Sequence, residues 1–328
     1  MTPVYSTVLR QAWQTVWRNK ALWFYGLFLV WIGQEAELII RNYSNHADGT
    51  LSLDSWRELF RSGFGGAFSD LFGGIQTTGG LIITLLILFA MVVLVVWLAV
   101  VSVGGIVHAT NEIAKRKPVK FDVSFAVGQH YFWRNFVIYA AAKVVDYFFL
   151  ILTGLLASII VTGYFGMTVG VILLVLSLGV TLILAFIAKY AAIYVVARDK
   201  PLGVAVHDAF KLFSNNWLAS IEMAIILFLI SFVVAAALLI SLIFIAVPFL
   251  LLAIILNTAE YSGFASVFIY SLLAIGIMAV VVIGSILTAF QFSAWTLFFN
   301  ELDSGKKVSK IVGWAERLSG RQVSPQKK

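Results

Sequence analysis

Six runs of apolar residues, each long enough to cross a membrane, constrain this chain more than any other feature. They lie near residues 21–40, 81–107, 136–161, 165–188, 217–244 and 264–299. An α-helix rises about 1.5 Å per residue, so about 20 residues cross the ~30 Å hydrocarbon core of a bilayer. Only 12% of the 328 residues are charged, against roughly 25% in soluble domains, which excludes an ordinary soluble protein.

We therefore expect an all-α fold, a polytopic membrane helical bundle of six transmembrane helices arranged as three hairpins. Residues 1–303 form a single integral membrane domain, residues 41–80 an external loop and residues 304–328 a basic cytoplasmic tail. The first span is the weakest, because Gln34, Glu35 and Glu37 interrupt it. We interpret these three as a water-facing span end rather than a cation site. A cleaved signal peptide is the alternative, but no small-residue cleavage pattern follows the run.

The apolar stretch from Trp217 to Leu256 is about 60 Å long as one helix, roughly twice the hydrocarbon core. Pro248 lies inside it and has no N–H to donate, so it is expected to interrupt the helix. We therefore end the fifth span near Phe244 and place residues 247–255 at the far surface or in a re-entrant segment.

The distribution of basic residues orients these spans. Nineteen Lys and Arg residues fall on the side of the two termini, and three (Arg41, Arg57 and Arg61) fall on the other side. Cytoplasmic loops carry the excess of Lys and Arg in multi-pass proteins. We expect a bacterial-type inner (plasma) membrane protein with its N-terminus and C-terminus in the cytoplasm.

An internal repeat precedes the first, third and fifth spans, where an amphipathic aromatic stretch ends at Asn19, Asn135 and Asn216. A second echo follows the even spans as Arg116-Lys-Pro-Val, Asp199-Lys-Pro-Leu and Gly305-Lys-Lys-Val. Such self-similarity is typical of a repeated structural unit. We predict three units, each a cytoplasmic interfacial amphipathic helix followed by a two-span hairpin, and a triplication as their origin.

The first of these stretches illustrates the expected membrane contact. Apolar residues four positions apart fall on one helical face, with two tryptophans beside it: Val4, Val8, Ala12 and Val16, with Trp13 and Trp17. Helices with such a face lie in the membrane interface, although span ends with an ordinary aromatic belt are an alternative. The predicted interfacial lipid contacts are Arg10, Trp13, Trp17, Arg18, Trp133 and Arg134.

This layout, together with the closing Ala294-Trp-Thr-Leu-Phe-Phe-Asn-Glu-Leu, resembles the membrane domain found with bacterial glycerophosphodiester phosphodiesterases and with related stand-alone membrane proteins of unassigned function. The resemblance covers roughly residues 81–302. It implies a six-span membrane domain, but the 28 residues after Asn300 cannot hold a phosphodiesterase barrel. No catalytic residue is therefore carried over.

Three ionisable residues inside the spans are the strongest candidates for a polar site, because charge in hydrocarbon costs at least about 2.5–3.5 kcal/mol. Lys143 and Asp146 are one turn apart on the third span, and Glu222 lies near the start of the fifth. We predict that Lys143 pairs with Asp146 or Glu222. Such a group serves either as a proton or ion relay or lipid head-group cavity, or as a neutralised pair that locks helix register.

Other patterns predict little chemistry. Gly166 and Gly170 form a small-residue pair that permits close helix packing, within or between subunits. The four histidines show no metal-ligand spacing, there is no cysteine, and no catalytic motif occurs, so no metal, cofactor or catalytic residue is predicted. The glycine-rich loop lacks a Gly-Lys-Ser/Thr sequence. The basic residues are explained by topology and anionic lipid, so no nucleic-acid partner is expected.

The resulting prediction is a non-enzymatic multi-pass membrane protein that handles or senses membrane lipid, or organises a membrane partner. Its expected partners are the lipids of the anionic inner leaflet, with a homo-oligomer or another membrane protein as further options. A small-molecule or ion transporter is the alternative, with Lys143, Asp146 and Glu222 as its intramembrane site. An intramembrane enzyme is the third class.

Overall fold

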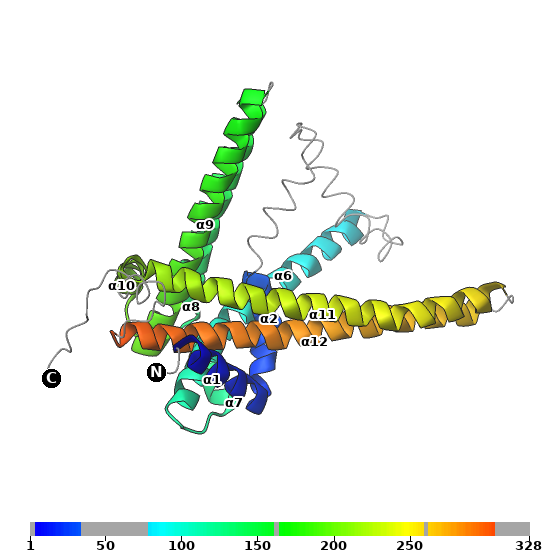
Figure 1. Cartoon of the computed structure of the whole chain (residues 1–328), viewed down its shortest axis with the longest axis horizontal. Coiled ribbons are helices and arrows are strands. Elements are labelled where there is room, and N and C mark those ends of the chain that lie inside the picture. The colour runs from blue at the N-terminus through cyan, green and yellow to red at the C-terminus, as the bar shows by residue number, and fades with distance from the viewer. Residues whose placement is uncertain (1–3, 34–77, 161–163, 259–261, 306–328) are drawn as a thin grey trace, which may run out of the picture.

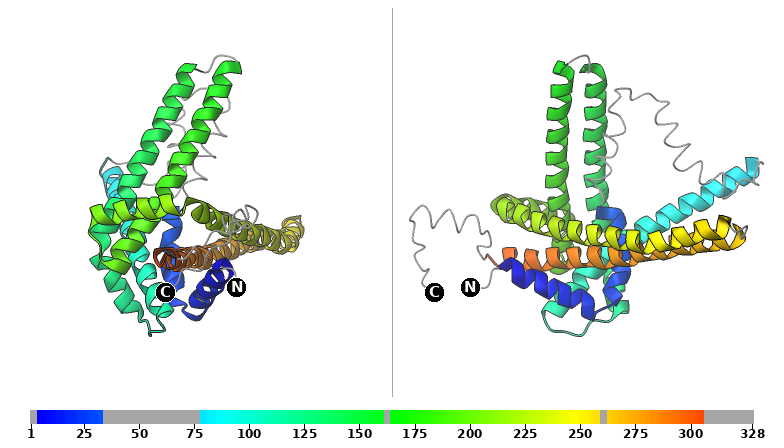
Figure 2. Two further views of the ribbon diagram at one scale, coloured as in Figure 1. Left: turned by 60° about the vertical axis from the view of Figure 1, so that its left-hand side comes forward. Right: turned by 45° about the vertical axis from the view of Figure 1, so that its right-hand side comes forward.

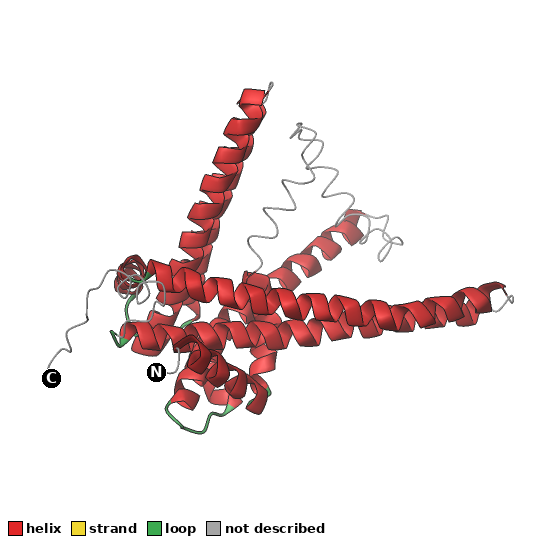
Figure 3. Ribbon diagram, in the orientation of Figure 1, coloured by secondary structure: helices red, strands yellow, loops and turns green. Residues whose placement is uncertain are grey.

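The computed structural model describes residues 4–33, 78–160, 164–258 and 262–305, and within these ranges the chain is helical with no strand (Figure 3). The helices are α1 (Val4–Arg18), α2 (Ala21–Gly33), α6 (Thr78–Ala114), α7 (Phe121–His130), α8 (Phe132–Ile160), α9 (Tyr164–Arg198), α10 (Leu202–Asn215), α11 (Trp217–Thr258) and α12 (Ser262–Asp303). The predicted all-α class is confirmed for the described residues. Glu35, Glu37 and most of the external loop lie outside them.

Four helices are long and apolar enough to cross a membrane, which supports a membrane protein. The qualifying stretches, in α6, α9, α11 and α12, are Leu85–Ala114, Val175–Arg198, Trp217–Ile255 and Val267–Asp303. The described part of α2 is apolar but has only 13 residues, about 20 Å of helix. The helix α8, which contains Lys143 and Asp146, is not among the four. The count of six spans stays a prediction.

The helix α11 corrects one predicted boundary. It continues from Trp217 to Thr258 with Pro248 inside it, so a helix end near Phe244 and a separate segment over 247–255 are wrong. Proline removes one backbone donor and disturbs one turn. In an apolar environment the other backbone groups have no water to bond, so the helix persists on both sides of the proline.

Three short amphipathic helices, α1, α7 and α10, lie beside the C-terminal ends of the long helices α12, α6 and α9. We call this packed region, which includes α2, the base. α1 packs against α12, α7 against α6, and α10 against α9 (Figure 1). The buried face of each short helix carries small side chains four residues apart: Val8, Ala12 and Val16 in α1, Ser124 and Gly128 in α7, and Ala205 and Ala209 in α10. Small side chains let these helix backbones approach their neighbours closely.

The contact between α6 and α7 depends on glycine. A Cβ atom added to Gly128 would lie 2.2 Å from the carbonyl oxygen of Val101. One added to Gly104 would lie 2.7 Å from the Cα of Gly128. Both distances are far below van der Waals contact, so neither glycine can be replaced without moving a backbone.

Away from the base, the apolar helices form separate arms rather than the predicted single bundle. α8 and α9 lie side by side in one arm, and α11 and α12 in another, and the two arms and α6 leave the base in clearly different directions (Figures 1 and 2). Of the most apolar windows in α11 and α12, only 6% and 0% of the residues are buried. Lipid tails are as apolar as leucine, so no hydrophobic force draws lipid-facing helices together.

Candidate functional site

Three long helices, α6, α9 and α12, end in the base with the same backbone conformation. The residues after their ends, Arg116, Asp199 and Gly305, have φ of 60°, 49° and 74°, and no other described residue has a positive φ. At Arg116 the Lys117 N–H donates to the Glu112 carbonyl at 3.0 Å, which is the long bond of a Schellman motif. These three residues open the three echoed segments of the sequence.

The residues five positions before these three are Asn111, Tyr194 and Asn300, and two of them are joined directly. Asn300 donates from Nδ2 to Oδ1 of Asn111 at 2.7 Å, which links α12 to α6. The Tyr194 hydroxyl donates to Oδ1 of Asp303 at 2.9 Å, which links α9 to α12. The three equivalent residues, Asn111, Tyr194 and Asn300, therefore each take part in a hydrogen bond that joins two of these helix ends.

The three repeated turns, predicted before the first, third and fifth spans, do not all occur at the expected asparagine. Asn19 and Asn216 lie where α1 and α10 end, and each donates from Nδ2 to the carbonyl four residues earlier, at 2.8 and 3.1 Å. In the second copy the break lies at Tyr131, four residues before Asn135, so the expected turn at Asn135 is wrong. Asn135 is instead fully buried in α8, and its side-chain amide has no hydrogen-bond partner among the described residues.

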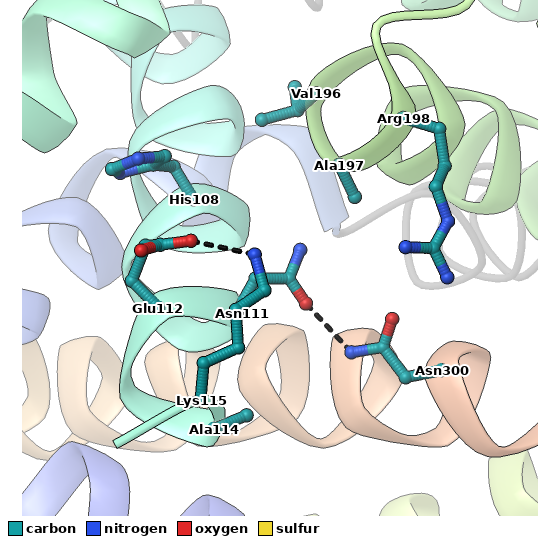
Figure 4. A pocket seen from close by; sticks show the side chains of 9 residues that line it. All are labelled: His108, Asn111, Glu112, Ala114, Lys115, Val196, Ala197, Arg198 and Asn300. Atoms are coloured by element: carbon teal, nitrogen blue, oxygen red, sulfur yellow. Dashed lines mark hydrogen bonds and ion pairs between the residues drawn. The ribbon is translucent and has the colours of Figure 1, made fainter. Parts of the chain in front are cut away.

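A cavity of about 280 Å³ lies between the ends of α6, α9 and α12, and we call it the base cavity (Figure 4). It is lined by His108, Asn111, Glu112, Ala114, Lys115, Val196, Ala197, Arg198 and Asn300. His108, Asn111, Glu112 and Lys115 recur at helical spacing on one face of α6.

Asn111 contributes a hydrogen-bond donor to this cavity. Its side chain is 7% exposed, and its Nδ2 has no partner among the described residues, although its Oδ1 is bonded to Asn300. In Figure 4 the Nδ2 of Asn111 and the Oδ1 of Asn300 both face Ala197 and Arg198 across the cavity. A buried donor without an acceptor costs about 1–3 kcal/mol, so this position favours an oxygen atom entering from outside the protein.

The charges around the base cavity are dominated by cations. Lys115 binds Glu112 at 2.7 Å, and Lys117 approaches the other oxygen of the same carboxylate at 3.4 Å. Arg198 donates from Nε and Nη2 to Asp303, and its Nη1 has no partner among the described residues. Two cations and one carboxylate therefore line the cavity, and that carboxylate is already held by two lysines.

The structure places the predicted intramembrane residues apart from this cavity. Glu222, on α11, accepts a hydrogen bond from the hydroxyl of Tyr5 on α1, and burial, followed by the contact with Glu222, raises the pKa of Tyr5. Asp146 is buried in α8, and Lys143 lies one turn before it. The pairing of Lys143 stays a prediction. Neither the base cavity nor the 140 Å³ cavity between α2, α6 and α7 is lined by these three residues.

The predicted interfacial helix α1 is present, but its aliphatic face does not face lipid. Val8, Ala12 and Val16 are 2%, 0% and 0% exposed because they pack against α12, which corrects that assignment. Trp13 and Trp17 stack on each other with ring centroids 5.3 Å apart and lie exposed on another side. The exposed side also carries the two arginines of the helix, Arg10 and Arg18.

The other predicted contact residues differ in their surroundings. Trp133 is the most exposed of these tryptophans, at 72%. Arg134 donates to Asp199 at 2.9 Å, and its guanidinium lies over the ring of Tyr131, so it joins α8 to the end of α9. Gly166 and Gly170 lie in the first turns of α9, where side-chain surroundings are outside the described part of the structure.

The sequence did not single out the Asn111–Asn300 pair or the glycine contact at Gly128. The signal for the pair was the echo at Arg116 and Gly305, because equal spacing from two equivalent helix ends selects both asparagines. Across the described residues, no group of three or more His, Asp or Glu side chains is arranged to hold a metal ion.

Comparison with protein-family models, with curated proteins and with solved structures found no match.

Proposed function

We propose that this chain is a six-span protein of a bacterial-type inner membrane, with both termini in the cytoplasm, that handles membrane lipid through the base cavity without catalysing a reaction. The observation that carries the proposal is the position of the cavity. It is lined by polar and charged side chains as well as by alanine and valine, and it lies where three apolar helices, α6, α9 and α12, end together. In a bilayer this is the level at which apolar tails give way to head groups.

Exposed aromatic and basic residues of the base support the same orientation. Trp13, Trp17, Trp133 and Trp217 are all about half exposed or more, and Arg10 and Arg18 are exposed beside the first two. Tryptophan is enriched at membrane interfaces, and arginine pairs with lipid phosphates there. A base of this composition holds the cavity at the surface of the inner leaflet.

The two described cavities do not support the transporter alternative, because neither is lined by Lys143, Asp146 or Glu222. The repeated packing of short helices on α12, α6 and α9 favours a cavity formed by three related units. The resemblance to the membrane domain of glycerophosphodiester phosphodiesterases remains part of this proposal and is compatible with a lipid ligand.

Native mass spectrometry of the detergent-purified protein tests the proposal. We expect one phospholipid per chain to survive detergent exchange. The variant Ala197→Phe, which fills the cavity, should lose it, whereas Ala126→Phe on the exposed side of α7 should retain it. Both variants carry the same added volume, so a loss common to both, or retention by both, contradicts lipid handling at this cavity.

A further inference from the structure

We propose that the base cavity is a phosphate-binding site, in which the buried Asn111 Nδ2 donates to a phosphate oxygen and Lys115 and Arg198 balance its charge. This inference rests on the proposed lipid function and names the chemical group that the cavity recognises. The observations that carry it are the unpartnered buried donor, the cationic lining and the volume of the cavity.

The unpartnered side-chain N–H donor of Asn111 favours a ligand that accepts hydrogen bonds. Nδ2 of Asn111 is an N–H donor only, and it is buried with no protein acceptor among the described residues. Nη1 of Arg198 is a second donor without a partner in the described part of the chain. Phosphate offers several strong acceptor oxygens, and arginine binds it with good geometry.

The charged residues that line the base cavity favour an anion over a metal ion or an ammonium group. The single carboxylate of the lining, Glu112, already binds Lys115 at 2.7 Å and Lys117 at 3.4 Å. A cation would have to displace these lysines. Together with their ion-pair partners Lys117 and Asp303, the charged lining residues carry three positive and two negative charges, so an anion is the better match. The C-terminal ends of three helices carry partial negative charge, but Lys115 and Arg198 lie in or beside the last turns and offset it.

The volume of the base cavity limits the size of the ligand that it can hold. A space of about 280 Å³ holds a phosphate with a small substituent but not acyl chains. A phospholipid would therefore place its head group in the base cavity and leave its chains outside. A free phosphate or phosphate ester from the cytoplasm offers the same chemistry, so the two sources must be separated by experiment.

Two binding measurements separate these sources. Inorganic phosphate is titrated into the full-length protein in detergent by isothermal titration calorimetry. In parallel, native mass spectrometry follows retention from nanodiscs of phosphatidic acid or of diacylglycerol in phosphatidylcholine. We expect saturable phosphate binding and selective retention of phosphatidic acid over diacylglycerol.

The decisive variant is Asn111→Asp, because it keeps an oxygen for Asn300 Nδ2 to bond and replaces the N–H donor with negative charge. We expect its affinity for the phosphate group to fall by about tenfold or more, the effect of a hydrogen bond to a charged group. Arg198→Gln should weaken binding in the same direction. Lys211→Gln removes an exposed charge from α10, outside the cavity lining, and should bind as the parent protein does.

The outcomes distinguish this inference from the proposed function. Phosphate binding that depends on Asn111 without retention of any phospholipid supports the inference and overturns the lipid function. Retention of diacylglycerol as strongly as phosphatidic acid, unaffected by Asn111→Asp, overturns the inference and leaves lipid handling standing. If Asn111→Asp does not fold, Arg198→Gln and Lys115→Gln decide, and unchanged phosphate affinity in both overturns the inference.

Discussion

Asn300 of α12 donates to Asn111 of α6 at 2.7 Å, and the two residues occupy equivalent positions before equivalent helix ends. Asn300→Ala should lower the free energy of unfolding by about 1–3 kcal/mol, because Oδ1 of the buried Asn111 loses its donor. Thermal unfolding in detergent measures the change. Asn215→Ala, at an exposed asparagine of α10, is the control and should change stability little. Equal effects of both variants would contradict a structural role for the pair.

Arg116→Gly should stabilise the protein. Arg116 has φ of 60°, and a left-handed conformation costs a residue with a Cβ atom about 1 kcal/mol relative to glycine. The midpoint of thermal unfolding should rise. Gly305→Ala, at the equivalent end of α12, should lower it. Changes of the same sign in the two variants would show that the backbone conformation is not the cause.

Gly128→Ala should destabilise the base. The new Cβ would lie 2.2 Å from the carbonyl oxygen of Val101, so α7 must move away from α6. Overpacking of this kind costs about 1–3 kcal/mol. Gly203→Ala is the matched control, since its Cβ would meet no atom within 4 Å, and alanine is the better helix former. Gly128→Ala should therefore lower the unfolding midpoint while Gly203→Ala maintains or raises it.

Tyr5→Phe should reduce stability at neutral pH by about 1 kcal/mol, because the hydroxyl that binds Glu222 is lost. The pKa of Tyr5 is raised above its ordinary value of 10.0 in the folded protein. The unfolded chain therefore ionises first, and the stability contributed by Tyr5 is present below pH 10 and is lost as the pH rises above it. The difference between parent and variant, measured by chemical denaturation, should shrink above pH 10. Tyr270→Phe, at an exposed tyrosine, should show no such difference.

Acid should weaken the ion pair between Lys200, which precedes α10, and Asp208 within that helix. Lys200 donates to Asp208 at 2.7 Å, and this bond lowers the pKa of Asp208 below 3.8. A lowered carboxyl pKa contributes stability above the unfolded pKa and loses it as the pH falls through the folded value. Asp208→Asn should therefore show a smaller loss of stability than the parent protein when the pH is lowered below 3.8. The effect is small because the pair is at the surface, and identical acid profiles would contradict the bond.

The helices of this chain were largely predictable from local properties. Apolar runs and amphipathic stretches determine helices because each residue contributes its own propensity and side-chain polarity. The echoed residues Arg116, Asp199 and Gly305 lie just after three helix ends, but the left-handed backbone conformation that they share was not predicted. Pro248 was misleading, because its local effect on a helix was outweighed by the apolar surroundings of α11.

Local sequence did not predict which part of the protein, or whether lipid, each apolar helix face would contact. Val8, Ala12 and Val16 form an apolar face that suits lipid or protein equally, and only the packing of α12 against α1 decided between them. The close contact at Gly128 depends on the path of α6, which lies elsewhere in the chain.

The sequence by itself determined that the chain is helical and rich in long apolar segments, and it located three equivalent helix ends. Only the tertiary structure decided that Asn111 meets Asn300 and that both residues line a cavity. The two asparagines are 189 positions apart. Their hydrogen bond depends on how α6 and α12 pack, and helix packing is set by contacts between distant segments rather than by the local preferences of either one.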